Sequence, residues 1–541
     1  MTARKLAVID LETDPFKYGR VPAPFAAGFY DGQTFVKTWG DDCIAQMLAH
    51  LRDYKDELVI YAHNGGKFDY WYLAHAISSP LSFIDSRLVK ARLYHHELRD
   101  SLKILPFRLA EYQKDKIDYR KMERSKRERY KNEIIDYLRG DCVYLYELIE
   151  QFRAQFGNVL TIGGAAMREI KARYEIEHIT QTEDAELRPY FHGGRCEAFK
   201  IGEIKGDWKL YDVNSLYPHV MAEFQHPHGI IGSSAKHIPE YAPFYLAHIV
   251  AESAGALPVR TKTGLEFPHG IVESFCTMHE INAALELGLI KIREVKRCLI
   301  FEQTRNFREF VYHFNQMKMD AEKRGDKAMR LFAKLIMNNG YGKFAQNPER
   351  FREFELFDTA EACETNGYAI DGEIPMITPG LSRVIGEIPA QLRRDSYYNV
   401  ATAASITGAA RSVLMRALHS AKDAIYCDTD SIVCTKLNAP IDPLKLGHWK
   451  LETEFDTFFC GGKKLYAAAR AGTFYACGSD GEKRPIKCAS KGAPMKPEDI
   501  ADVARGKAKT VPIEAPSLRI GESARFIERT ITREDLRKAR K

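Results

Sequence analysis

The sequence lacks paired cysteines, long apolar runs and room for a leader segment. Its eleven cysteines include no Cys-x-x-Cys pair, so neither a zinc ribbon nor a cysteine-ligated cluster is indicated. No apolar stretch approaches the roughly 20 residues that a membrane-spanning helix needs. A strand-like run that carries acids begins within the first ten residues, which leaves no space for a signal or transit peptide. We therefore expect reduced core thiols, no membrane association, and action in the compartment where the chain is made.

The chain also has little excess charge of one sign, +6 over 541 residues, but that charge is unevenly placed. Between Lys114 and Lys131, nine Lys or Arg accompany four Asp or Glu. This segment follows a strand-like run over 101–105, and it could track phosphates or form a solvated helix of alternating charge. The chain is 45% hydrophobic, and cores seldom grow past about 250 to 300 residues, so we expect several packed domains.

Two carboxylates two residues apart, Asp428 and Asp430, are the most informative feature. Apolar residues at 425–427 and 431–433 flank them, which predicts a buried strand with both acids on one side. Such a pair is costly to bury unless a cation compensates it. Asp212, in a second apolar strand-like run, would complete a divalent metal site suited to phosphoryl transfer. The alternative for the bare tripeptide is a tight turn whose aspartates cap backbone amides.

A third segment carries Arg330, Lys334, Asn338 and Tyr341 at i, i+4, i+8 and i+11. This spacing places all four on one helical face. Two cations followed by an amide and an aromatic ring suit a triphosphate, a sugar and a stacked base. The alternative is an amphipathic helix with a solvated basic stripe.

Together the three segments resemble motifs A, B and C of family B DNA polymerases, in order and in spacing. They are 212–218 for Asp-x-x-Ser-Leu-Tyr-Pro, 334–342 for Lys-x-x-x-Asn-Ser-x-Tyr-Gly, and 428–430 for Asp-Thr-Asp. Asn339 stands where the family has serine, a small polar exchange. The resemblance implies that Asp212 and Asp430 are the main metal ligands, with Asp428 beside them.

The same resemblance implies where the nucleotide binds. Tyr217 would lie under the sugar and exclude a 2′-hydroxyl, while Lys334 and Arg330 would neutralise the triphosphate. The predicted nucleotide-binding residues are Val213, Tyr217, Arg330, Lys334, Asn338 and Tyr341.

The amino-terminal third carries a separate set of acids. Asp10 and Glu12 share one side of the first strand-like run, Asp69 closes the segment 63–69, and Tyr137 precedes Asp141 by one helical turn. Four carboxylates could hold two metals while a tyrosine orients the attacking water. Each motif alone is common as a strand end, a turn or a solvated helix pair. All three in order resemble the 3′-5′ exonuclease motifs of the DEDDy class, which implies these four acids as metal ligands and Tyr137 as the water-orienting residue.

Further residues are expected to contact DNA. His63, Asn64 and Phe68 would contact the displaced 3′ end, although Phe68 could equally be core. Phe191, Gly193 and Gly194 resemble the Tyr-x-Gly-Gly linker motif that contacts the template, where glycine allows close backbone approach. A plain Gly-Gly turn is the alternative for that segment.

Two later motifs complete the predicted DNA contacts. The run 463–466 reads as a strand with Lys464 and Tyr466 on one face, and it resembles the Lys-x-Tyr motif that holds the primer terminus. Lys464 could also neutralise charge beside the catalytic acids. Arg411, in a helical segment before Asp428, resembles a template-contacting residue, with a surface salt bridge as the alternative.

The resemblance implies an α/β and α+β multidomain fold. An RNase H-like exonuclease domain would span 1–185, ending in the polar stretch 180–186, and a right-hand polymerase domain would span 186–541. The palm would carry motifs A and C, the fingers about 306–346 and the thumb about 470–541.

Two long intervals, one before motif B and one after it, exceed what the palm and finger helices need. The first, about 222–305, contains a turn over 264–270 and a capped helix over 278–288. The second, about 347–395, reads as an extended hairpin with turns at Asn366-Gly367 and Asp371-Gly372. They resemble the terminal-protein-region insertions of protein-primed family B polymerases of phages and linear plasmids. Local structure without a partner is the alternative for each.

The predicted function is a DNA-directed DNA polymerase with a proofreading exonuclease, started on a terminal protein and able to displace a strand. Each active site would use two Mg²⁺ ions, with Mn²⁺ possible, and the chain would be a monomer in the cytoplasm of the host cell. Its partners would be template-primer DNA, deoxynucleotides and the priming protein. The alternatives are a family B polymerase that uses nucleic-acid primers, and an exonuclease or DNA-binding replication factor with an inactive polymerase site.

Overall fold

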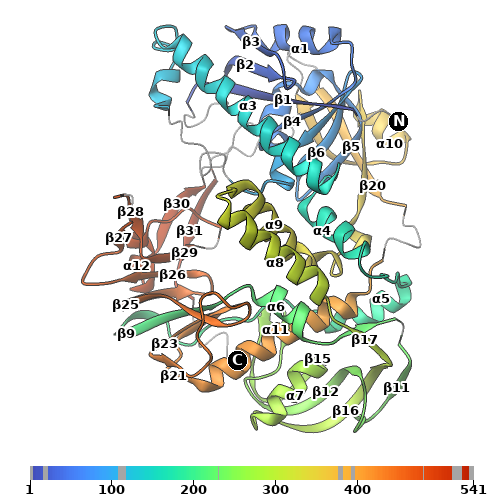
Figure 1. Cartoon of the computed structure of the whole chain (residues 1–541), viewed down its shortest axis with the longest axis vertical. Helices are drawn as coiled ribbons and strands as arrows, with labels where there is room; N and C mark the ends of the chain where they lie inside the picture. The colour runs from blue at the N-terminus through green and yellow to red at the C-terminus, as the bar shows by residue number, and fades with distance from the viewer. Residues whose placement is uncertain are drawn as a thin grey trace.

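The computed structural model describes residues 4–15, 22–107, 117–229, 231–375, 382–391, 397–478, 481–490, 492–513 and 527–534. The amino-terminal third forms a lobe at the top of the molecule, and a second large sheet lies below it, with a helical hairpin between them (Figure 1). Among the described residues, no helix is both long and apolar enough to span a bilayer.

A ten-stranded sheet forms the core of the upper lobe, in the order β19-β20-β18-β5-β6-β7-β4-β1-β2-β3. Its amino-terminal strands are β1 (Lys5–Thr13), β2 (Pro24–Tyr30), β3 (Phe35–Trp39), β4 (Leu58–Ala62), β5 (Ile77–Ile84), β6 (Arg87–Leu93) and β7 (His96–Asp100). β1 pairs antiparallel with β2 and parallel with β4. Because helices cover both faces, β1 reads as one continuous apolar run.

Alternate residues of β1 face the two helices that cover the sheet. Leu6 and Val8 pack with α3 (Lys131–Phe156), whereas Ala7 and Ile9 pack with α1 (Cys43–Asp53). This alternation follows from the two-residue period of a strand. It leaves Asp10 and Glu12 on the α3 side, at the end of the strand.

Two expectations for the region after β7 are wrong. The run 101–105 is not a strand, because a 3₁₀ turn over Ser101–Lys103 follows β7, and the carboxylate of Asp100 caps it by accepting the N–H of Leu102 at 2.9 Å. The basic segment is not one helix either. Residues 108–116 lie outside the described residues, a 3₁₀ helix spans Tyr119–Met122, and α3 begins at Lys131.

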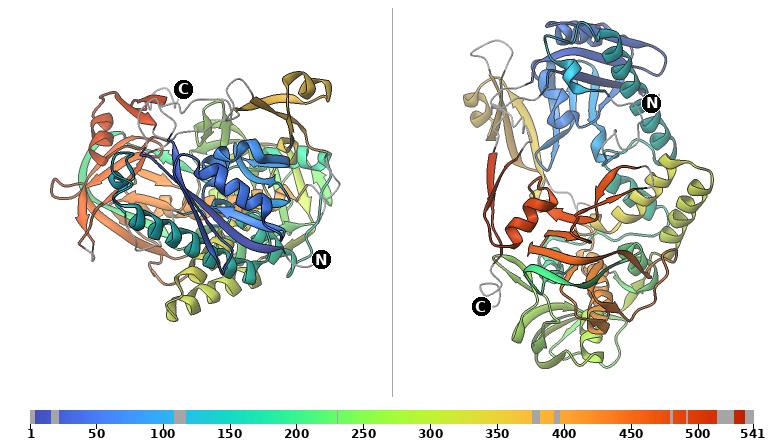
Figure 2. Two further views of the ribbon diagram at one scale, coloured as in Figure 1. Left: turned by 90° about the horizontal axis from the view of Figure 1, so that it is seen from above. Right: turned by 90° about the vertical axis from the view of Figure 1, so that its left-hand side faces the viewer.

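The second predicted insertion extends the same sheet. It forms β18 (Arg352–Phe357), α10 (Ala360–Thr365), β19 (Ala369–Pro375) and β20 (Ser382–Pro389). β18 pairs with β5, with Phe354 opposite Leu81. Figure 2 shows these strands, in tan, beside the blue strands of the upper lobe, although about 270 residues separate the two in the chain.

Neither predicted hairpin turn in this insertion forms. Asn366 and Gly367 instead terminate α10, with Gly367 at φ +80°, since a left-handed glycine serves a helix end as well as a hairpin. Asp371 and Gly372 lie inside β19, where the pairing register shifts between Ile370 and Gly372. The extended character of the insertion is confirmed, but α10 interrupts it.

A seven-stranded sheet forms the lower half, in the order β29-β26-β25-β9-β23-β22-β8. Its strands are β8 (Cys196–Ala198), β9 (Gly202–Val213), β22 (Tyr426–Asp428), β23 (Ser431–Cys434), β25 (Trp449–Gly462), β26 (Leu465–Ala469) and β29 (Lys487–Ser490). One face packs against α6 (Leu216–Glu223) and α11 (Val400–Ser420). The other face of the sheet carries a buried cluster rich in aromatic residues, which includes Trp208 and Phe458.

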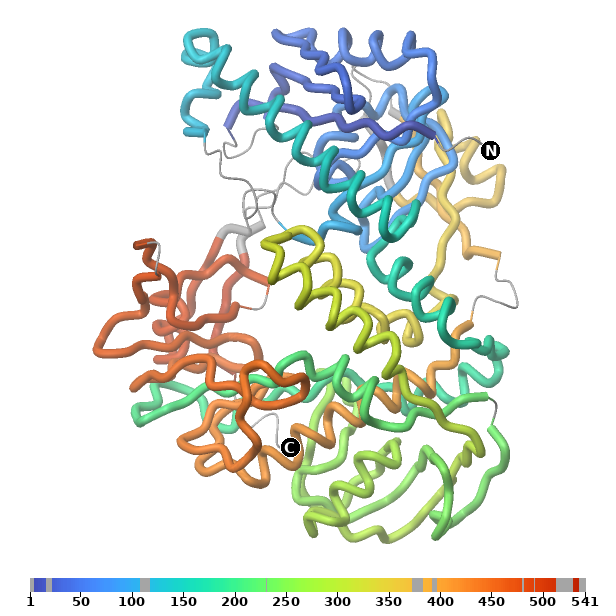
Figure 3. The backbone as a smooth tube through the Cα atoms, viewed as in Figure 1, coloured from blue at the N-terminus to red at the C-terminus, as the bar shows by residue number. Residues whose placement is uncertain are grey.

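The helical hairpin of α8 (Arg308–Lys323) and α9 (Lys327–Asn339) lies between the lobes (Figure 1). The hairpin packs against the upper lobe, where the ring of Phe332 on α9 contacts that of Phe152 on α3 with centroids 5.2 Å apart. Figure 3 shows the chain descending from α3 through α4 (Ile162–Lys171) and α5 (Gln181–Leu187). The polar stretch expected to separate two domains is therefore helical, with a Thr180–Glu183 capping box at its start.

The first predicted insertion forms a four-stranded sheet in the order β11-β16-β12-β15. Its strands are β11 (Ser233–Ala235), β12 (Phe244–Ala254), β15 (His269–Thr277) and β16 (Ile290–Phe301), with a small β13 (Val259–Thr261) and β14 (Gly264–Glu266) hairpin. The predicted capped helix is α7 (Met278–Glu286), and a Thr277–Glu280 capping box starts it. α7 packs against α11, so the insertion is continuous with the lower lobe.

The carboxy-terminal part adds short elements beside β25 and β26. They are β27 (Tyr475–Cys477), β28 (Lys483–Pro485), α12 (Pro497–Ala504), β30 (Lys509–Ile513) and β31 (Ile527–Ile531). α12 packs its apolar face on β25 and β26.

Candidate active sites

Three of the four acids predicted in the upper lobe converge. Asp10 and Glu12 leave β1 on one side, α3 brings Asp141 against them, and their carboxylate oxygens lie within 4.8 Å of one another. Asp69 begins the short helix α2 (Asp69–Tyr72) and is buried. Hard oxygen ligands gathered in this way fit a divalent cation.

The electrostatics of this cluster favour a cation. Burial, together with Asp141 and Asp69, raises the pKa of Glu12 to about 8. Burial also raises the pKa of Asp69 to about 7 and that of Asp10 well above its usual range. Carboxyl groups that resist ionisation because they are buried and repel one another are stabilised in their charged form by a nearby cation.

Tyr137 lies one helical turn before Asp141 on α3, as predicted. Its hydroxyl hydrogen-bonds Tyr119, and burial raises its pKa. The phenol therefore remains protonated at neutral pH. It can donate or accept a hydrogen bond beside the acids, as a water-orienting group must.

A buried ion pair that the sequence did not indicate holds the loop before Asp69. The carboxylate of Asp100 accepts the N–H of Asn64 at 3.1 Å and pairs with Arg87 at 2.7 Å. Arg87 also donates to the side-chain oxygen of Asn64 at 2.6 Å. Asn64 has a φ of +65°, a conformation that asparagine tolerates better than most residues. The one signal of this pair in the sequence is the aspartate directly before the run 101–105.

His63 differs from expectation, because hydrogen bonds within the loop engage its ring. Both ring nitrogens of His63 are engaged, one with the Phe107 carbonyl oxygen at 2.8 Å and one with the Ser101 hydroxyl at 3.0 Å. Its polar atoms thus hold the loop together rather than facing a substrate. Phe68 is half-buried, and its ring lies against that of Tyr72 with centroids 5.4 Å apart.

The lower acidic site is built on a hairpin rather than on one strand. β22 ends at Asp428, β23 begins at Ser431, and Asp428 pairs with Ser431 across a two-residue turn. Thr429 in that turn has a φ of +57°. The expectation of both acids along one buried strand is therefore wrong, and the tight-turn alternative describes the backbone.

The hairpin nevertheless brings the acids together, because β23 pairs with β9 and places Ser431 opposite Asp212. The N–H of Val213 donates to the carbonyl oxygen of Asp430 at 2.8 Å, which ties the turn to the end of β9. Burial and the neighbouring Asp212 raise the pKa of Asp430 to about 6. Burial also raises the pKa of Asp212.

Two lysines approach these acids. Lys450, directly opposite Asp212 in the sheet, lies 3.4 Å from its carboxylate, and Lys464 lies 3.4 Å from that of Asp428. Nothing in the sequence indicates that Lys450 belongs to this site, because only the pairing register of β9 with β25 brings it next to Asp212. Three acids on adjacent strand ends, partly neutralised by lysines, form a second set of hard ligands.

The predicted nucleotide-binding face lies on α9, as expected. Arg330 and Lys334 are exposed and Asn338 is half-buried. The helix ends at Asn339, so Tyr341 falls in the following 3₁₀ turn, where its ring stacks on that of Tyr217 with centroids 4.3 Å and planes 13° apart. This aromatic pair links α9 to α6, which directly follows Asp212 and Val213.

The Gly193–Gly194 segment lies against the acidic hairpin. A Cβ on Gly194 would stand 2.7 Å from the Thr429 hydroxyl, whereas a Cβ on Gly193 would meet nothing within 4 Å. The N–H of Thr429 donates to the carbonyl oxygen of Arg195 at 2.6 Å. Glycine is thus required at 194 for close packing, and 193 presents an open face beside the acids.

Three predicted DNA-contacting residues differ from expectation. Lys464 precedes β26 at a φ of +58°, so it does not share a strand face with Tyr466, whose buried ring packs on Tyr426 with centroids 5.0 Å apart. Arg411 is neither a template contact nor a surface pair, because its side chain is 1% exposed and pairs with Glu280 at 2.7 Å. A buried guanidinium whose charge is compensated in this way is withdrawn from DNA.

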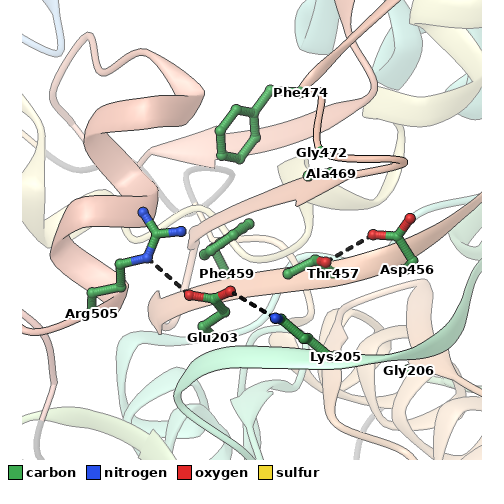
Figure 4. Close-up of a pocket in the computed structure, with 10 residues that line it drawn as sticks. All are labelled: Glu203, Lys205, Gly206, Asp456, Thr457, Phe459, Ala469, Gly472, Phe474 and Arg505. Atoms are coloured by element: carbon green, nitrogen blue, oxygen red, sulfur yellow. Dashed lines mark hydrogen bonds and ion pairs between the residues drawn. The ribbon is translucent and has the colours of Figure 1, made fainter.

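A pocket of about 630 Å³ lies apart from both acidic sites (Figure 4). Across it, Arg505 pairs with Glu203 at 2.9 Å and its guanidinium lies over the Phe459 ring at 4.9 Å. These groups satisfy one another, and none of the predicted catalytic acids lines the pocket.

Comparison with known proteins identifies the family. Residues 55–376 match the family described as DNA polymerase type B, organellar and viral. The DNA-directed DNA polymerase of Enterobacteria phage PRD1 is 42% identical over 97% of this chain and 98% of that protein. The DNA polymerase of Bacillus phage phi29 is 28% identical over 67% of this chain and 66% of that protein.

The fold comparison agrees. The structure of phi29 DNA polymerase complexed with primer-template DNA has a TM-score of 0.71 to this chain at 20% sequence identity, covering 98% of this chain and all of that one. The predicted combination of an exonuclease domain with a polymerase domain is confirmed, as is the prediction of a protein-primed family B polymerase. The chain belongs to the type B DNA polymerases of organelles and viruses, and it is a DNA-directed DNA polymerase.

Proposed function

We propose that the chain runs two metal-dependent reactions at two separate acidic sites. Nucleotidyl transfer takes place at Asp212, Asp428 and Asp430, and 3′-5′ hydrolysis at the upper cluster of Asp10, Glu12, Asp69 and Asp141. The observation that carries the proposal is that each site brings carboxylates together from separate elements, with Asp10, Glu12 and Asp141 within 4.8 Å of one another and Asp212 beside the Asp428–Asp430 hairpin. Two Mg²⁺ ions per site, or Mn²⁺, would activate the attacking oxygen and stabilise the leaving one.

In nucleotidyl transfer the primer 3′-hydroxyl attacks the α-phosphorus of the nucleotide and pyrophosphate leaves. Arg330 and Lys334 on the exposed face of α9 neutralise the triphosphate charge as it moves to the leaving group. Asn338, Val213 and the Tyr217–Tyr341 stack hold the sugar and base beside Asp430.

In the upper site a water molecule attacks the terminal phosphodiester and a nucleoside monophosphate leaves. The protonated hydroxyl of Tyr137 orients that water next to Asp141. Asn64 and Phe68 hold the frayed 3′ end, on a loop that Asp100 and Arg87 keep in place.

We further propose the following division of the chain. The exonuclease domain spans 1–185 and the polymerase domain 186–541, with a first insertion at about 222–305, fingers at about 306–346, a second insertion at about 347–395 and a thumb at about 470–541. Solved relatives are complexed with primer-template DNA and nucleotides, and we infer the same partners here, together with a terminal protein whose hydroxyl starts synthesis. A monomer acting in the host cytoplasm remains a prediction.

Replacing Tyr217 with alanine is expected to relax the exclusion of ribonucleotides. The Tyr217 ring fills the space beside the sugar and is braced by Tyr341, so its removal opens room for a 2′-hydroxyl. We expect the ratio of ribonucleotide to deoxynucleotide incorporation to rise about ten- to hundredfold, measured as kcat/KM for single additions. Tyr312→Ala, an exposed tyrosine on α8, is the matched control, and an unchanged ratio for Tyr217→Ala would contradict this role.

Extension of a primed circular single-stranded template tests strand displacement. Because β18 joins the second insertion to the sheet of the upper lobe, that insertion can separate an incoming strand without moving relative to the exonuclease domain. With Mg²⁺ and no helicase or clamp, we expect products many circles long. Products that stop at one circle would remove strand displacement from the proposal, and the absence of any product would contradict nucleotidyl transfer.

A further inference from the structure

The segment 191–195, which carries Gly193 and Gly194, is bound along its length by the first insertion. Its contacts with the insertion are Arg260 Nη2 to the Phe191 carbonyl oxygen at 2.6 Å, His192 Nε2 to the Phe275 carbonyl oxygen at 3.0 Å, and the Arg195 guanidinium over the Phe267 ring at 4.2 Å. Each contact comes from a different part of the insertion. The segment is therefore held by the insertion as a unit.

A buried ion pair strengthens this connection. Arg411 on α11 pairs with Glu280 on α7 at 2.7 Å, and each side chain is only 1% exposed. Through its Nη1 atom Arg411 also donates to the carbonyl oxygens of His192 and Gly193, both at 2.7 Å. The guanidinium thus fixes the backbone of the glycine segment, while Glu280 compensates its charge.

Glu280 itself has little freedom. Its carboxylate accepts the N–H of Thr277 at 3.0 Å and the Thr277 hydroxyl at 2.9 Å, forming the capping box of α7. A Cβ on Gly408 of α11 would lie 2.2 Å from the Thr277 hydroxyl. The start of α7 is therefore locked against the backbone of α11 at the point where Arg411 reaches across.

The other end of the segment leads to the polymerase acids. Arg195 accepts the N–H of Thr429 at 2.6 Å, and Gly194 packs against the Thr429 side chain. Thr429 stands between Asp428 and Asp430. A continuous path of contacts, buried at Glu280 and Arg411 and half-buried at Thr429, therefore runs from α7 in the insertion to the catalytic hairpin.

From this path we propose that Glu280 is a positioning residue for primer-template binding. It acts through Arg411 to hold the Gly193–Gly194 backbone beside the acidic hairpin, so the first insertion is part of the polymerase site in addition to any partner it docks. This inference rests on the proposed template contact at Gly193 and Gly194.

The main test is a double replacement, Glu280→Leu with Arg411→Leu. Replacing both members of a buried ion pair with apolar residues is often neutral or stabilising, whereas removing one member leaves an uncompensated charge. We expect the double variant to keep its melting temperature within a few degrees, while its Kd for primer-template DNA rises about tenfold and exonuclease activity on single-stranded DNA stays within about twofold. A stable double variant with the wild-type Kd would overturn the proposal.

Arg260→Ala is a second variant that cannot unfold a core, because Arg260 is exposed. It removes the hydrogen bond to the Phe191 carbonyl oxygen, and we expect a Kd increase of about two- to threefold. The matched control is Arg293→Ala, an exposed arginine of the same insertion that pairs with Glu252 at 2.6 Å. Equal Kd values for Arg260→Ala and Arg293→Ala would overturn the proposal even if the double variant failed to fold.

Salt dependence separates positioning from direct phosphate contact. A lost phosphate contact lowers the slope of log Kd against log salt by roughly one, whereas a displaced backbone changes Kd at constant slope. We expect the wild-type slope for the double variant and for Arg260→Ala. A slope reduced by about one in both would overturn the positioning role.

Gly193→Val distinguishes failure of this inference from failure of the proposed template contact. A Cβ at 193 would meet no atom within 4 Å, so we expect a side chain there to obstruct an approaching strand rather than the protein itself. An unchanged Kd for Gly193→Val would overturn the template contact and the inference with it. A weakened Gly193→Val together with an unchanged double variant would overturn the inference alone.

Discussion

Asp430→Ala is expected to reduce primer extension by about a thousandfold or more while exonuclease activity on single-stranded DNA stays within about twofold. A divalent cation contributes several kcal/mol of transition-state stabilisation, and each 1.36 kcal/mol is a factor of ten in rate. Asp430 stands where the β22–β23 hairpin meets the end of β9, beside Asp212. Single-nucleotide addition with Mg²⁺ measures the loss.

Folding controls make this result interpretable. Burial and Asp212 raise the pKa of Asp430 to about 6, so removing its carboxylate relieves repulsion and should not lower the melting temperature measured in chelator. Asp430→Asn keeps the side-chain volume and should lose extension to a similar degree. Asp207→Ala, an exposed aspartate on the same strand as Asp212, should keep both activities. Extension by a folded Asp430→Ala protein at more than a tenth of the wild-type rate would refute the assignment.

Asp10→Ala combined with Glu12→Ala is expected to give the opposite separation. Degradation of a single-stranded 3′ end should fall by about a thousandfold or more, because two of the acids that would hold the cations are lost, while extension of a matched primer stays within about twofold. The two acids share one side of β1 and meet Asp141 within 4.8 Å. Misincorporated 3′ ends should consequently persist in the products.

Metal binding provides an independent readout of this upper site. Ligands that bind only the folded state raise its stability by RT ln(1 + [L]/Kd). Added Mg²⁺ should therefore raise the wild-type melting temperature, and the increase should be smaller in the double variant. Asp136→Ala, an exposed aspartate one residue before Tyr137, is the matched control and should behave as wild type. A double variant that still degrades single strands would show that other residues hold the cations.

The sequence indicated candidate reactive residues, but it did not indicate the backbone that carries them. Asp212 and Asp430 were predicted because acids inside apolar runs are a local signal, whereas Tyr217 followed from the resemblance to motif A. The sequence predicted one strand through 428–430, but the structure has a hairpin with a positive φ at Thr429. Apolar residues on both sides of a short segment fit a turn as well as a continuous strand, so the sequence did not distinguish the two.

Residues whose roles depend on remote partners were the ones misjudged. Arg411 was expected to contact the template, with a surface salt bridge as the alternative, yet Glu280, which is 131 positions away, compensates its charge in the core. Lys450 carried no signal at all, and only the pairing of β25 with β9 places it beside Asp212. Asn366 and Gly367, which were predicted to form a hairpin turn, likewise lie at the end of α10.

What the sequence determined by itself was the family of the chain and the order of its candidate reactive groups, because these depend on residue identity and short spacing. What the tertiary structure decided was which strands pair, which insertion joins which sheet and which charges are buried. Two examples of such long-range contacts are the pairing of β18 with β5 and the buried ion pair between Glu280 and Arg411. Such contacts depend on free energies of burial and pairing between segments far apart in the chain, and no local pattern in the sequence encodes them.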